Sequence, residues 1–191
     1  NRKLLVVVAV AAVLALLAGA AVGRNLLSSP ATPAPQADVV RFKDTVANVS
    51  IAYPATWRRL PQRLGDPDLA LLAAADDSTS LLMRVSASGL TAPVTAKTLP
   101  IVRKYTDGLL SADQRAKQLV APVAVSAGGL PGWRYRYTFG SGANIGAHDH
   151  YFLFKGDRMI QLVFQAVPAQ RLPALAPVFD SIAASFRGHD A

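Results

Sequence analysis

The chain opens with its longest uninterrupted apolar segment, which runs from residue 4 to residue 22 without a charged or strongly polar side chain. As a helix, such a segment spans roughly 28 Å, close to the ~30 Å hydrocarbon core of a bilayer. A helix in a globular core normally keeps a polar face, and this segment has none. Because Arg2 and Lys3 precede it and Arg24 follows it, we expect residues 1–24 to form a transmembrane signal anchor.

A cleaved signal peptide is the alternative interpretation, since Ala18-Gly19-Ala20 supplies the small-residue pattern of a cleavage site. In both cases the basic residues stay in the cytoplasm and the rest of the chain is exported. Residues 25–37 contain three prolines, which deny helix and ladder hydrogen bonds and predict an extended linker. The expected product is a single-pass protein of the plasma membrane with residues 38–191 outside the cytoplasm, or a secreted protein if the segment is removed.

Beyond the linker, short β-branched and aromatic runs alternate with turn residues, a pattern typical of antiparallel strands. A first hairpin is predicted over residues 39–53 and a second over residues 69–88, with Asp76-Asp77-Ser78 in its turn. Thr98 suits the cap of a helix that runs to about Leu110, and another strand is predicted over residues 118–125. On this helix Ile101, Tyr105 and Leu109 are expected to share the buried face.

The clearest strand signals lie between residues 133 and 166. Aromatic side chains at positions 133, 135, 137 and 139 alternate with Arg134, Arg136 and Thr138, which predicts one aromatic and one cationic face. Residues 148–155 and 158–166 flank Gly156-Asp157, a two-residue hairpin signal. If Lys155 pairs with Arg158, both faces of this hairpin are apolar, so layers are expected on both sides of the sheet.

A final helix supplies one of these layers. Apolar residues recur in it at intervals of three and four, and Gly188 is its expected end. The predicted fold class is α+β, an antiparallel sheet sandwiched by helices and preceded by one transmembrane helix. The absence of βαβ alternation disfavours a doubly wound nucleotide-binding fold. The apolar stripe consists of Leu172, Leu175, Phe179, Ile182 and Phe186.

The amino-acid composition excludes several classes of functional site. The 191 residues carry a net charge of +8 and no cysteine, which excludes disulfides, thiol nucleophiles, thiolate zinc sites and lipid attached to cysteine. The positive charge would suit nucleic acid, but export disfavours that partner. Residues 38–191 hold 17 of the 20 basic residues and all 12 acids, a net charge of 17 − 12 = +5.

Two groups of side chains are candidates for function. His148 and His150 point to one face of a strand, yet two ligands make a weak metal site, and no metal or cofactor is predicted. The largest grouping of cationic and aromatic residues is the candidate surface for a partner or ligand. The alternative interpretation is an ordinary solvated strand face without a function. That surface consists of Trp57, Arg58, Arg59, Trp133, Arg134 and Arg136.

Several of these segments resemble the PsbP-like domain family. The stretch FKDTVANVSIAYPATWRRL from Phe42, with its Tyr53-Pro54-x-x-Trp57 element, is similar to the opening of those domains. The later segments GLPGWRYRYTF and YFLFKGDRMIQLVF and a closing helix ending Ser185-Phe186 follow in the same order. Over residues 39–187 the chain is most similar to exported actinobacterial proteins of the LpqN type, but it lacks their lipobox cysteine.

The resemblance implies an antiparallel sheet between helices and a non-enzymatic role, since PsbP-like proteins act by docking to larger complexes. We therefore expect a membrane-anchored domain that binds a protein partner in the cell envelope. The alternative is a carrier or sensor of a small apolar or lipid ligand held between sheet and helix, because some relatives are linked to envelope lipid trafficking. That alternative needs a cavity of about 300 Å³ or more.

Overall fold

In the computed structural model the described residues are 38–61, 66–112, 115–141 and 145–189. The predicted anchor and the whole predicted linker, residues 1–37, lie outside them. Within the described ranges no helix has the length and hydropathy needed to cross a bilayer. The strands are β1 (Val39–Asp44), β2 (Val49–Pro54), β3 (Arg58–Arg59), β4 (Leu69–Asp76), β5 (Thr79–Ala87), β6 (Lys117–Ala127), β7 (Leu130–Phe139), β8 (Gly146–Lys155), β9 (Arg158–Ala166) and β10 (Arg187–Gly188). The helices are η1 (Leu99–Val102), α2 (Arg103–Ser111), η3 (Ala169–Arg171) and α3 (Leu172–Ala184).

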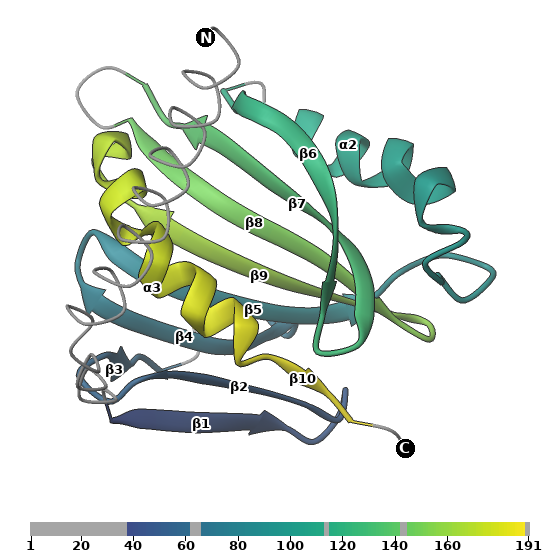
Figure 1. Cartoon of the computed structure of the whole chain (residues 1–191), viewed down its shortest axis with the longest axis horizontal. Helices are drawn as coiled ribbons and strands as arrows, with labels where there is room; N and C mark the ends of the chain where they lie inside the picture. The colour runs from purple at the N-terminus through teal and green to yellow at the C-terminus, as the bar shows by residue number, and fades with distance from the viewer. Residues whose placement is uncertain (1–37, 62–65, 113–114, 142–144, 190–191) are drawn as a thin grey trace, which may run out of the picture. The chain divides into compact units, whose positions relative to one another are not determined.

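Seven strands form an antiparallel sheet in the order β3-β4-β5-β9-β8-β7-β6 (Figure 1). Its central hairpin joins β8 to β9, and Lys155 pairs with Arg158 as the sequence predicts. Gly156 occupies the turn with a φ of 57°, a conformation that glycine adopts without the steric penalty of a Cβ atom. The register of this hairpin decides which side chains face each layer of the fold.

Both faces of the central hairpin are buried, which confirms the prediction of two covering layers. Helix α3 lies across one face (Figure 1), where its apolar stripe packs on Tyr151, Leu153 and Phe164. Segments η1 and α2 contribute to the core on the other face, which contains Phe152 and Phe154. The antiparallel α+β architecture therefore follows from a sheet whose middle strands are apolar on both sides.

The amino-terminal hairpin forms a separate sheet, which the sequence interpretation of one sandwiched sheet did not anticipate. Strands β1, β2 and β10 pair antiparallel in the order β1-β2-β10. The last helix ends at Ala184 rather than at Gly188, and Arg187 and Gly188 instead pair with β2. Gly188 also donates its N–H to the carbonyl of Gly128, in the β6–β7 turn. Pairing with β2 and the bond to Gly128 satisfy the backbone of these two residues outside the helix.

The predicted inner face of the mid-chain helix was wrong for two of its three residues. Ile101 is 78% exposed and Leu109 is also exposed, while Tyr105 is half-buried. The segment begins as a 3₁₀ turn before it becomes α-helical, and this change of period rotates the face that the 3.6-residue repeat assigns. The residues that pack toward the sheet are Leu99, Val102, Tyr105, Thr106 and Leu110.

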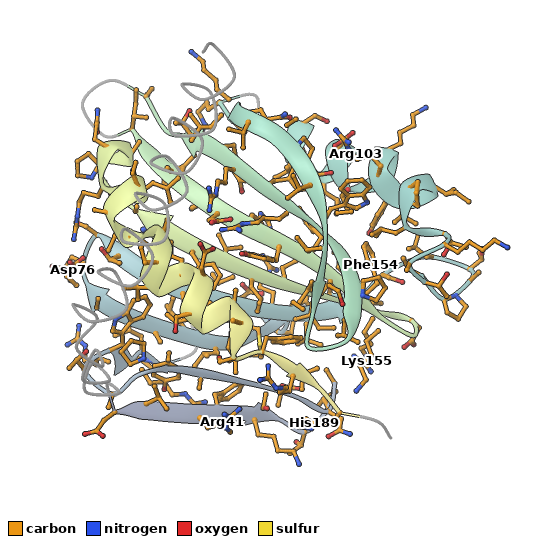
Figure 2. The ribbon with its side chains drawn as sticks, viewed as in Figure 1. Arg41, Asp76, Arg103, Phe154, Lys155 and His189 are labelled. Carbon is orange, nitrogen blue, oxygen red and sulfur yellow. The ribbon has the colours of Figure 1, made fainter. Side chains whose placement is uncertain are left out.

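Lys155 connects the carboxyl-terminal segment to the first hairpin (Figure 2). Its Nζ donates to the carbonyl oxygens of Ala47 at 2.9 Å, Asn48 at 3.0 Å and His189 at 2.5 Å. An ammonium group has three N–H donors, so this lysine is fully used by backbone acceptors. The contact holds three segments that are distant in sequence.

Candidate functional site

Arg134 and Arg136 lie on the α3 side of strand β7 because side chains alternate along a strand, and there they meet a buried carboxylate. Asp149 on the neighbouring strand β8 is fully buried. Its Oδ1 accepts from Arg134 Nε at 2.7 Å, and its Oδ2 accepts from Arg136 Nε at 3.0 Å. The cationic face that the sequence predicts is therefore a partly buried ion-pair cluster built around Asp149.

Helix α3 completes this cluster from above. The carboxylate of Asp180 accepts a hydrogen bond from Arg134 Nη2 at 2.5 Å, and the Arg134 guanidinium lies 4.9 Å from the centre of the Tyr151 ring. Burial lowers the pKa of Arg134, but the hydrogen bonds and charge of Asp149 outweigh burial and hold that pKa above its ordinary value. Two guanidinium groups and two carboxylates make the cluster neutral.

The structure does not bring the six sequence-predicted residues together on one surface. Trp57 and Trp133 are buried, and the Trp133 indole N–H donates to the carbonyl of Leu99. Arg58 and Arg59 are exposed on β3, which lies at the opposite end of the strand order from β7. Both parts of the grouping, residues 57–59 and residues 133–136, combine tryptophan with arginine, but the strand order places them far apart in the sheet.

The two strand histidines share one face of β8, as the alternation predicts, and both contact Tyr137. The Tyr137 hydroxyl lies 3.0 Å from His150 Nδ1 and 3.1 Å from His148 Nδ1. Each Nε2 contacts a glutamine oxygen on β9, Gln161 for His150 and Gln165 for His148. Within the described ranges no cluster of three or more His, Cys, Asp or Glu side chains is arranged to hold a metal ion. The pair belongs to a polar row that crosses three strands.

We expect His150 to make stability depend on pH. Burial first, and the nearby His148 second, lower the pKa of His150 to about 3, whereas an unfolded histidine titrates near ~6.5. Between these values the unfolded chain binds a proton that the folded chain does not, so stability is full above pH ~6.5 and falls as pH drops, by up to about 1.4 kcal/mol per unit. Urea unfolding at several pH values should show a shallower slope for His150→Gln; an identical slope in both proteins would contradict this assignment.

Described residues line three cavities of note. One of about 220 Å³ lies between α2 and the sheet, and one of about 270 Å³ lies between α3 and the β6–β7 hairpin. The largest of these three, about 490 Å³, is a groove over the part of the sheet built by β4, β5 and β9. We call it the open-face groove; its apolar lining residues are Leu60, Leu69, Leu72, Ala74, Leu82 and Val163, and its polar ones are Arg58, Asp66, Asp76, Asp77, Ser80, His148 and Gln165.

Three exposed apolar side chains lie on β6, the last strand of the seven-stranded sheet. Leu119 is 50% exposed, Val120 is 55% exposed and Val123 is 51% exposed. Among the described strands β6 pairs with β7 alone, so its other edge offers backbone donors and acceptors. Sequence reasoning placed a strand here without assigning it a role; the available signal was the run of residues 118–133, which has no charged side chain. We call Leu119, Val120 and Val123 with this edge the β6 surface.

Comparison with known proteins bears on the fold. No family model and no curated protein sequence matches the chain. The solution structure of the cyanobacterial PsbP protein from Synechocystis matches with a TM-score of 0.56 and 14% identity, covering 85% of this chain and 99% of that one. The crystal structure of LpqN from Mycobacterium tuberculosis, described as involved in cell envelope biogenesis, matches with a TM-score of 0.56 and 13% identity, covering 83% and 86%.

A crystal structure from Bacteroides thetaiotaomicron matches with a TM-score of 0.51 and 12% identity, covering 78% of this chain and 48% of that one. Identities this low make each of these likenesses a statement about fold alone. They confirm the predicted PsbP-like fold over the described residues. The narrower resemblance to actinobacterial proteins stays a prediction.

Proposed function

We propose that residues 38–191 form a non-enzymatic docking domain that lies outside the cytoplasm and binds a protein partner of the cell envelope through the β6 surface. The apolar segment 4–22 with its flanking basic residues supports export and anchoring. The polar groups that sequence analysis singled out are engaged with one another in the Asp149 cluster and the histidine row, which favours a binding role over a catalytic one.

The observation that carries the proposal is the exposure of three large apolar side chains on an edge strand within an uncharged stretch. Exposed apolar surface of this kind marks interaction sites, and an open strand edge binds an extended polypeptide through main-chain hydrogen bonds. The +5 charge of residues 38–191 disfavours a second copy of the chain.

The test is co-purification of the full chain, with its amino-terminal segment, from native membranes after mild cross-linking. We expect a specific protein to be recovered with the unmodified chain and with Ile101→Lys, whose side chain is exposed on η1. Val123→Lys should lose it, because a lysine on the edge opposes strand addition. Recovery that is equal for both variants would contradict docking at β6.

A second candidate function rests on the open-face groove. Its volume of about 490 Å³ lies within the range of about 300–1,000 Å³ typical of ligand sites, and its floor is apolar. The space lies on the open face and not between sheet and helix, where the two cavities are smaller. A carrier of a small apolar or lipid ligand would use it.

This second candidate predicts that a fluorescent fatty acid binds the full chain and that Leu82→Arg, at the groove floor, abolishes binding. Ile101→Arg places the same charge on an exposed site and should have no effect. Absence of binding to the unmodified chain, or equal binding by both variants, would remove the carrier function from consideration.

A further inference from the structure

The cavity between helix α3 and the β6–β7 hairpin adjoins the β6 surface. Residues 125–128 of the hairpin form one wall, and Ala183 and Ala184 of α3 form the other. Arg134, Tyr151 and Asp180 supply its charged and polar groups. Val125 lines the cavity only two residues after Val123, so a segment bound along β6 passes its mouth.

Tyr151 directs an unused hydroxyl into this cavity. Tyr151 is 5% exposed, and no described residue hydrogen-bonds to its hydroxyl. That hydroxyl is not fully buried, unlike the unpartnered polar atoms of Thr79 and Arg84. The hydroxyl is therefore reached from the cavity that Tyr151 lines. Burial, with a smaller contribution from Asp149, raises the pKa of Tyr151, so the group remains an O–H donor at neutral pH.

Arg134 adds further donors. Its Nε and Nη2 are taken by Asp149 and Asp180, while no hydrogen bond joins Nη1 to a described residue. The acidic group at the cavity is Asp180, which is half-exposed and already directed at Nη2. Behind these residues, Arg136 and Asp149 compensate each other. The cavity thus offers more unused donors than acceptors.

We propose that this cavity receives the carboxylate of an acidic side chain from the docking partner, whose flanking apolar residues lie on the β6 surface. This inference rests on the proposed docking function and specifies the chemistry of its partner. A carboxylate is the acceptor that guanidinium and hydroxyl donors bind most strongly, and the +5 charge of residues 38–191 favours an acidic partner. Cation binding is disfavoured by the Arg134 guanidinium at the cavity floor.

The test uses the full chain in lipid nanodiscs and two labelled peptides, acetyl-Thr-Val-Glu-Val-Thr-amide and its Gln counterpart, with binding followed by fluorescence anisotropy. We expect the Glu peptide to bind about tenfold more tightly than the Gln peptide, as a charged hydrogen-bond acceptor would. Tyr151→Phe keeps the buried ring and removes only the hydroxyl, so it should fold normally and lose most of this preference.

Asp180→Asn should change the affinity for the Glu peptide in the opposite direction. Removing the competing carboxylate should strengthen binding of the Glu peptide, whereas the same change would weaken binding at a site for cations. Equal binding of the two peptides, no binding of either, an unchanged preference in Tyr151→Phe, or weaker binding by Asp180→Asn would each overturn the inference. The docking function is judged separately, because the partner recovered from membranes should still depend on Val123 if only the carboxylate pocket is wrong.

Discussion

Asp149→Ala is expected to lower the free energy of unfolding by about 3–5 kcal/mol, the usual cost of removing one partner from a buried ion pair. The carboxylate is fully buried and accepts hydrogen bonds from both Arg134 and Arg136. Its loss leaves two guanidinium groups beneath helix α3 with only half-exposed Asp180 to compensate them. Urea denaturation followed by circular dichroism measures the change.

Asp157→Ala is the matched control for this substitution. Asp157 is exposed in the turn between β8 and β9, and a change at such a position normally stays within about 0.5 kcal/mol. If Asp149→Ala proved as mild as Asp157→Ala, the arginines would have another source of compensation and the ion-pair cluster would not hold α3 on the sheet.

Trp57→Ala is expected to destabilise the domain by about 3–5 kcal/mol, as large-to-small substitutions of buried aromatic residues do. Trp57 is buried in the apolar core to which both sheets and α3 contribute. The centre of its ring lies 6.5 Å from that of Phe179 on α3, in an edge-on arrangement. The substitution removes the indole and leaves a cavity that the surrounding strands fill only in part.

Trp57→Phe keeps an aromatic ring at the position and should cost clearly less than Trp57→Ala. Both variants are compared with the parent chain by thermal and urea unfolding. A melting curve for Trp57→Ala that coincides with that of the parent would show that this side chain contributes nothing to the core and would return it to the list of candidate surface residues.

Much of the strand layout is readable from sequence because its signals are local. The alternation at residues 133–139 and the Gly156-Asp157 turn depend only on neighbouring residues, and both appear in the structure as predicted. The stripe of the last helix is equally local, and its residues Phe179, Ile182 and Phe186 are buried. Periodicity also placed His148 and His150 on one face of β8.

Features that depend on long-range contacts were not readable. The sequence around Arg134 does not predict its ion pairs with Asp149 and Asp180, because these acids lie on another strand and on a helix. The pairing of β10 with β2 joins the two ends of the domain. The sheet order that separates Arg58 from Arg136 is likewise a property of the whole fold. The exposure of Val123 follows from β6 lying at the edge, which no local pattern states.

The central claim is that the β6 surface binds a protein partner, and site-specific photo-cross-linking in native membranes tests it most directly. A photoreactive phenylalanine analogue replaces Val123 in the full chain. A matched chain carries the analogue at Ile101, which is exposed on η1. We predict one discrete protein adduct from position 123, lost when Leu119→Lys is added, and none from position 101. Adducts of equal pattern from both positions, or adducts with lipid alone at position 123, would contradict the claim.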